Sequence, residues 1–395
     1  MSDSSLASNV SQVTASGPPA KRALRLGGGP AGYVENALKA VAEPFKGITA
    51  DGTVVPGLFP IQKTGVPTDS IRAAAENFLA SLKPEQHAGT LFPVDTVEWR
   101  KWSNIHRTLM RHGMPLFEMT DTQRHRAFAL LKETLSTQGF ETARDIMRLN
   151  ETVMEMTGRL DEYGEDLYWL SIMGRPSATQ PWGWQLDGHH LNINTFVLGD
   201  QIVMTPTFLG SEPVYAQSGK YAGTRVFKAE EERGLAVIRA LSADQRNKAV
   251  LARDLPREPF TTAFRDNFEL HYTGIRYDGL SSSQRDLLCR LVELHVGRIR
   301  PDHAEIKMEE VKRHLQQTHF AWMGGVEEDS VFYYRVHSPV IIVEFDHQRG
   351  QAFPQYEKPY RDHIHVVVRT PNGNDYGKDL LRQHYEQSHR DWSTG

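Results

Sequence analysis

The chain has 395 residues, and its 45 lysines and arginines nearly balance 49 aspartates and glutamates, giving a formal net charge of −4. Because this balance comes without a block of like charge, it argues against nucleic acid as a partner. Neither a signal peptide nor an apolar run of about 20 residues is recognised, so we expect no membrane contact and a cytoplasmic protein.

The first 32 residues are rich in Ser, Ala and Val and poor in large apolar side chains, which predicts a disordered leader. The run Gly27–Gly32 formally matches the dinucleotide fingerprint, but no Val- or Ile-rich strand precedes it. We therefore interpret this run as a flexible boundary ahead of a helix predicted over 33–45.

Two helix-start signals recur along the chain in the same order. Leu82–Gln86 resembles Leu241–Gln245, and Met119–Arg124 resembles Leu280–Arg285. Three of the four are capping boxes, in which Ser or Thr is followed three residues later by Gln, and the fourth has a proline at its start. The repeated order predicts an internal duplication, with one half at 33–226 and the other at 227–395.

Each predicted half begins with helices and ends with strands. Helices are expected over 124–136 and 140–157, then over 285–296 and 303–318, with a last one over 379–387. Strands rich in β-branched and aromatic residues are expected at 166–172, 184–189 and 191–197, matched respectively to 329–335, 343–347 and 362–368. Gly199–Asp200 is typical of a hairpin turn. The pattern predicts an α+β fold of two duplicated halves, each with helices followed by antiparallel strands.

Histidine is abundant in this sequence, with 17 residues against a single cysteine, Cys289, so a metal would need His and carboxylate ligands. His363 and His365 have the i, i+2 spacing that places two imidazoles on one face of a strand. The predicted ligands are His189, His190, His347, His363 and His365. They would hold a divalent ion, zinc, copper or iron. The helical histidines at positions 87, 106, 125, 295, 303 and 314 are expected on solvent-exposed faces.

Other polar residues gather near the same strands. The predicted catalytic carboxylates are Asp187, Glu344 and Asp346, and the predicted substrate-binding residues are Trp184, Asn192, Asn194, Arg369, Asn372, Asp375 and Tyr376. Two structural interpretations stay open. Strand aromatics such as Trp184 are more often part of the core, and the 369–375 segment could instead form a structural turn in which Arg369 pairs with Asp375.

Two strings carry a resemblance to a known family. Residues 181–194 (PWGWQLDGHHLNIN) and 363–377 (HIHVVVRTPNGNDYG) resemble the hallmark segments of the domain-of-unknown-function family numbered thirty-five hundred, found in bacteria and fungi. The resemblance covers about residues 65–387. It implies that the two segments form one site, and it implies no reaction.

The residues favour a metal-dependent enzyme that acts on a small polar or anionic molecule. Hydrolysis is favoured because carboxylates flank the histidines and no redox-cofactor motif is present. The alternatives are a His-ligated copper or iron oxidoreductase and a non-catalytic protein that binds a small ligand. Substrate and oligomeric state stay open.

Overall fold

The computed structural model describes residues 32–105 and 111–393, so most of the predicted leader lies outside the described residues. The described part has ten α-helices: α1 (Tyr33–Ala42), α2 (Asp69–Leu79), α3 (Pro84–Ala88), α4 (Asp121–Thr134), α5 (Thr137–Thr157), α6 (Lys228–Ala240), α7 (Ala243–Ala249), α8 (Ser282–Val296), α9 (Pro301–Arg313) and α10 (Lys378–Ser393). None of these helices has both the length and the apolar character needed to cross a bilayer.

The strands of the described residues form one mixed sheet of thirteen. They are β1 (Leu91–Phe92), β2 (Met114–Pro115), β3 (Tyr168–Met173), β4 (Trp182–Gly188), β5 (Leu191–Leu198), β6 (Gln201–Val203), β7 (Thr207–Ser211), β8 (Val250–Ala252), β9 (Ile275–Arg276), β10 (His319–Gly324), β11 (Phe332–His337), β12 (Ile342–His347) and β13 (Ile364–Arg369). The predicted α+β class is confirmed. Gly199 has φ +60 in the predicted hairpin, which joins β5 to β6.

The strand order is β1-β3-β4-β5-β7-β13-β12-β11-β10-β8. The first five strands come from the first part of the chain and the last five from the second, and each set runs in chain order from its own edge of the sheet inward. At each edge a short strand pairs in parallel with a long one, β1 with β3 and β8 with β10. At the centre β7 and β13 run antiparallel. This central pair joins strands from the first part of the chain to strands from the second.

The strand correspondence in the sheet differs from the one expected from sequence. The order matches β3 with β10, whereas the sequence pattern matched residues 166–172 with 329–335, which fall in β11. Strand β10 was missed because a helix was predicted up to Thr318, directly before its first residue. The helix itself, α9, ends at Arg313, and a 3-10 turn (Leu315–Gln317) leads into the strand.

The four helix starts are confirmed, and their glutamines make matching bonds. Thr120, Ser242 and Ser281 form capping boxes, and α3 begins at Pro84. The Gln123 amide donates to the Ser81 carbonyl and to Gln86. In the same way the Gln284 amide donates to the Ala240 carbonyl and to Gln245.

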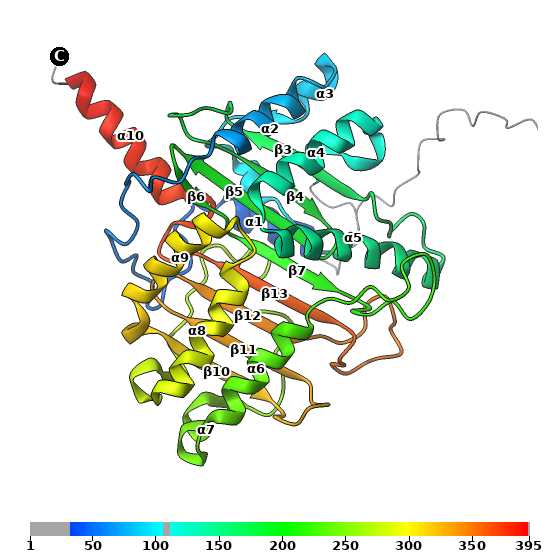
Figure 1. Ribbon diagram of the computed structural model, residues 1–395, viewed down its shortest axis with the longest axis vertical. Helices are drawn as coiled ribbons and strands as arrows, with labels where there is room; N and C mark the ends of the chain where they lie inside the picture. Colours follow the sequence, from blue (N-terminus) through cyan, green and yellow to red (C-terminus); the bar gives the residue numbers. More distant parts are fainter. Residues whose placement is uncertain (1–31, 106–110, 394–395) are drawn as a thin grey trace, which may run out of the picture.

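Five helices lie on the same face of the sheet, α4 and α5 over strands of the first part and α6, α8 and α9 over strands of the second (Figure 1). We call this the helix face. Alternation along β13 sends Ile364, Val366 and Val368 into the large core on this side. Val367 packs with Trp99 and Trp102 in a separate core on the other side. The same alternation places His363 and His365 away from the helices.

The opposite face, which we call the loop face, is covered by α1 and by long connections. Arg100 ties these together: its guanidinium donates to the carbonyls of Ala40, Val41 and Glu43 at the end of α1 and pairs with Asp266. Both charged groups are buried, and each is fully paired, as buried charges must be. Distant connections are thereby fixed over the histidine-bearing strands.

Candidate metal centre

Three histidines from distant parts of the chain converge on the loop face. His190 lies in the turn between β4 and β5, and His363 and His365 lie at the start of β13. The Nε2 atom of His363 is 3.2 Å from that of His190 and 3.0 Å from that of His365, and His190 and His365 are also 3.2 Å apart. All three side chains are buried.

The turn at His190 gives its ring this direction. His190 has φ +59, a left-handed conformation that costs free energy for a residue with a side chain. Its backbone N–H donates to the Asn104 carbonyl, and its carbonyl accepts from the N–H of Gly210 on β7. Because both backbone groups are bonded, the neighbouring segments hold the unusual conformation, and the ring turns toward β13.

A hydrogen bond at Nδ1 of His363 determines that its Nε2 faces the other two rings. His363 donates from Nδ1 to the Arg349 carbonyl at 2.7 Å, so its Nε2 lone pair points at the other two rings. Burial lowers the pKa of His363, and burial with the neighbouring His363 and His190 lowers the pKa of His365. Lowered pKa values keep the imidazoles neutral, which is the form that binds metal.

The geometry fits a small divalent ion. Zinc binds imidazole nitrogen at about 2.0–2.1 Å, and two ligands of a tetrahedral ion are then about 3.3 Å apart. Among the described residues, His190, His363 and His365 form a group of His, Cys, Asp and Glu side chains close enough to share one ion. Three protein ligands leave a coordination position for water or substrate, as in catalytic sites.

Glu212 was not singled out in the sequence and supports this centre. Its carboxylate accepts the backbone N–H groups of Gln351 and Ala352 and the Tyr360 hydroxyl. One carboxylate oxygen also lies 3.5 Å from Nδ1 of His363. Glu212 thus fixes the segment whose Arg349 carbonyl orients the ring. Nothing in the string Ser211-Glu212-Pro213 indicates this contact.

The three predicted catalytic carboxylates are placed differently. Asp346 on β12 lies directly opposite His365 on β13 in the strand register. The Oδ1 atom of Asp346 has no hydrogen-bond partner among the described residues. Burial, then the nearby Glu344 charge, raises the pKa of Asp346 well above its usual value. Glu344 instead accepts the N–H groups of Phe260 and Thr261, and Asp187 pairs with Arg111. Only Asp346 of the three keeps an open oxygen.

Two predicted ligands are absent from the converging group. The His189 ring stacks on His190 with centroids 3.9 Å apart, and its Nδ1 donates to Asn150. His347 lies on the helix face, where its Nε2 donates to Glu231 of α6 at 3.1 Å. The alternation of β12 explains this placement, because neighbouring residues Asp346 and His347 point to opposite faces. His347 therefore lies on the face opposite the converging group, and His189 lies beside His190 without joining that group.

The polar side chains of the 369–376 segment make hydrogen bonds to other parts of the protein. Each of the three guanidinium nitrogens of buried Arg369 donates to the protein: Nε to Asp375, Nη1 to the Thr261 carbonyl and Nη2 to Asp266. The Tyr376 hydroxyl donates to Asp266. Asn372, at φ +57, binds the Pro339 carbonyl and the Val55 N–H. The polar groups of these residues bind the protein itself, and their role in substrate binding stays a prediction.

The remaining predicted substrate residues also contact protein. Asn194 accepts from Gln185 and donates to Asn192, which donates to Asp187. These hydrogen bonds connect Gln185, Asn194 and Asn192 in a row that ends at Asp187. Trp184 belongs to the large core of the helix face, as its alternative interpretation allowed.

Comparison with known proteins gives a family but no function. Neither a curated protein nor a solved structure matches the chain. The model of a family described as "Protein of unknown function (DUF3500)" matches residues 64–378, a span that includes the turn at His190 and both histidines of β13. The chain belongs to the DUF3500 family.

Proposed function

We propose that the protein is a metal-dependent enzyme that hydrolyses a small polar or anionic molecule. The observation that carries the proposal is the convergence of three buried imidazole Nε2 atoms, 3.0–3.2 Å apart, from two distant segments. Neutral nitrogens brought this close repel one another unless a cation or a shared proton lies between them. A divalent ion supplies that cation.

The residues around the ion would divide the work. When bound, a zinc-like ion lowers the pKa of its water toward about 7 and so supplies a nucleophile. Asp346 would be the group placed to accept a proton from that water, because it lies beside His365 on the neighbouring strand and its Oδ1 has no hydrogen-bond partner among the described residues. The Arg349 carbonyl keeps His363 in the metal-binding tautomer.

Elemental analysis of the purified protein tests the proposal. We expect about one equivalent of metal per chain, and loss of most of it in the double variant His363→Ala/His365→Ala. The matched control is His347→Gln, which removes an equally buried strand histidine on the opposite face. Metal content that is low in the natural protein, or equal in the double variant and the control, would refute a metal centre.

One observation favours a second chemistry at the same site. The converging ligand group contains histidines and no carboxylate, a donor set that also suits copper or non-haem iron in oxidation. The metal found by the same analysis separates the two: zinc supports hydrolysis, and copper or iron supports the oxidoreductase.

We also infer that the two halves of the chain arose by duplication. The sheet order that reads alike from both edges and the matching bonds of Gln123 and Gln284 support this. Gly113 and Gly274, at φ +91 and +93, pack in the same way against β3 and β10. Gln123→Ala and Gln284→Ala should therefore lose similar amounts of stability in urea unfolding, and a neutral result for one of them alone contradicts the equivalence.

A further inference from the structure

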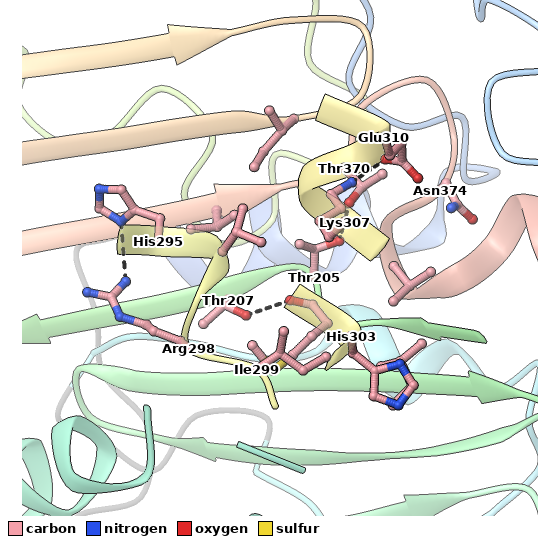
Figure 2. A pocket seen from close by; sticks show the side chains of 16 residues that line it. Thr205, Thr207, His295, Arg298, Ile299, His303, Lys307, Glu310, Thr370 and Asn374 are labelled. Carbon is pink, nitrogen blue, oxygen red and sulfur yellow. Dashed lines mark hydrogen bonds and ion pairs between the residues drawn. The ribbon is translucent and has the colours of Figure 1, made fainter. Parts of the chain in front are cut away.

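A cavity lies on the helix face, on the other side of the sheet from the three histidines. It is bounded by α8, α9 and the segment between them on one side and by β6, β7 and β13 on the other (Figure 2). Its volume is about 70 Å³. Its apolar lining residues are Ile202, Val203, Met204, Val296, Ile299, Ile341 and Val368. This room suits a branched apolar group of a few carbon atoms.

Helix α9 supplies the polar side of the cavity. His303, Lys307 and Glu310 follow one another at i, i+4 and i+7, which places them on one face of the helix. The Lys307 ammonium donates to Glu310 at 2.5 Å and to the Val340 carbonyl at 2.9 Å. An ammonium has three N–H donors, so these two bonds leave one for a ligand.

His303, one helical turn before Lys307, also lines the cavity and has a buried ring nitrogen. The sequence predicted an exposed side chain, but His303 is only 5% exposed, and its Nε2 has no hydrogen-bond partner among the described residues. Burial lowers the pKa of His303 to about 4, so the ring is neutral and can donate one hydrogen bond. An unpartnered buried donor costs free energy, which indicates that a ligand atom completes it.

The threonine hydroxyls that line the cavity are already hydrogen-bonded, and the charged side chains at its mouth sum to a positive charge. The hydroxyls of Thr205 and Thr370 bond each other, and Thr207 donates to the Met204 carbonyl. Arg313 lines the adjoining pocket, which shares His303, Lys307 and Glu310 with the cavity. Arg298 also lines the cavity but is paired with buried Glu230. Lys307 and Arg313 against Glu310 then give this mouth a net charge of +1. The complementary ligand has an apolar body and a single anionic head.

We propose that this cavity binds a small branched aliphatic monocarboxylate, whose carboxylate accepts a hydrogen bond from Lys307 while its alkyl group fills the aliphatic end. Val368 lines the cavity from β13, the strand that carries His365 on its other face. The carboxylate site is therefore separate from the three-histidine centre and does not depend on the metal.

Isothermal titration of the full chain with isobutyrate tests the proposal, with isobutanol, which keeps the branched alkyl group and has CH2OH in place of the carboxylate, as the uncharged probe. We expect saturable isobutyrate binding, at least tenfold weaker binding of isobutanol, and at least tenfold weaker isobutyrate binding to Lys307→Met, which keeps the aliphatic stem. Lys312→Met, an exposed lysine of the same helix, is the control and should bind like the natural protein.

Two further variants separate this site from the metal centre. Ile202→Phe, on half-buried β6, fills the aliphatic end and should abolish binding while the protein stays folded. His365→Ala should leave isobutyrate binding unchanged even when metal is lost. Absence of saturable binding, equal affinity in Lys307→Met, or loss of isobutyrate binding in His365→Ala would overturn the proposal.

Discussion

The Nε2 atoms of His190 and His365 lie 3.2 Å apart, although 175 positions separate the two residues in the chain. Gly210 of β7 lies against both rings. A Cβ at this position would be 2.8 Å from Cδ2 of His365 and 3.0 Å from Cδ2 of His190. The absence of a side chain at Gly210 is therefore what allows the two imidazoles to meet.

Gly210→Ala should displace the rings and weaken the metal centre. The added methyl group would also meet the Ile364 carbonyl at 2.9 Å, so relief requires movement of backbone as well as side chains. We expect a loss of about 1–3 kcal/mol in the free energy of unfolding, typical of overpacking, together with reduced metal content. Urea unfolding and elemental analysis measure the two effects.

Gly89→Ala is the control, because a Cβ there meets nothing closer than 3.8 Å and the backbone angle is ordinary. Unchanged stability and metal content in Gly210→Ala would show that the rings do not depend on the close approach.

Glu212→Gln should weaken metal binding without removing a ligand. The change preserves size but replaces one carboxylate oxygen by an amide that repels the N–H donors of Gln351 and Ala352. The segment carrying the Arg349 carbonyl then loosens, and His363 loses its fixed orientation. Loss of such supporting contacts costs about 10- to 100-fold in metal affinity. A competition titration against a chelator of known affinity measures this.

Tyr360→Phe removes only one of the bonds to Glu212 and should have a smaller effect in the same direction. Exposed Glu85→Gln controls for the loss of charge. Natural affinity in Glu212→Gln would mean that the carbonyl alone orients His363.

The site was predictable from sequence as far as strand periodicity reaches. The i, i+2 spacing of His363 and His365 predicts that both side chains face the same side of the sheet, and in the structure both lie on the loop face. Periodicity does not tell which face carries the helices, so Asp346 and His347 were both assigned to the site although only Asp346 faces it. The approach of His190 depends on a left-handed turn and on Gly210, which are tertiary features.

Arg369 illustrates the same limit for charged residues. Its sequence neighbourhood suits a ligand-binding loop and a structural turn equally well. The partners that decide between them, Asp266 and the Thr261 carbonyl, are more than 100 positions away. The fold class, by contrast, rests on local signals, the capping boxes and the strand composition, and was predicted correctly.

Arg369→Met should destabilise the protein strongly. Asp375 would be left as a buried charge without its partner, and Asp266 would keep only Arg100. Breaking a buried pair in this way costs about 3–5 kcal/mol. Arg382→Met, which breaks exposed pairs with Asp379 and Glu386, should cost at most about 1 kcal/mol. Urea unfolding compares the two. Natural stability in Arg369→Met, combined with impaired turnover, would support the substrate-binding role.

Stability should fall in acid because of buried histidines away from the metal centre. Burial, then the charge of Arg298, lowers the pKa of His295 well below its usual value, and burial, then Arg335, does the same for His337. The unfolded chain takes up these protons below about pH 6.5, whereas the folded protein does not until the pH reaches the lowered values. The contribution of each histidine to stability is thus complete above pH 6.5 and is lost progressively below it.

Urea unfolding of the chelator-treated protein between pH 7.5 and 5.5 measures this effect without the metal. Each of the two histidines should contribute a decrease of up to about 1.4 kcal/mol per pH unit below 6.5. His295→Gln keeps a donor for the Tyr334 hydroxyl and should flatten the curve by one histidine's share, whereas exposed His125→Gln should leave the slope unchanged. An equal slope in His295→Gln and the natural protein would mean that His295 can take up a proton in the folded state, since only a ring held neutral by burial makes stability depend on pH in this range.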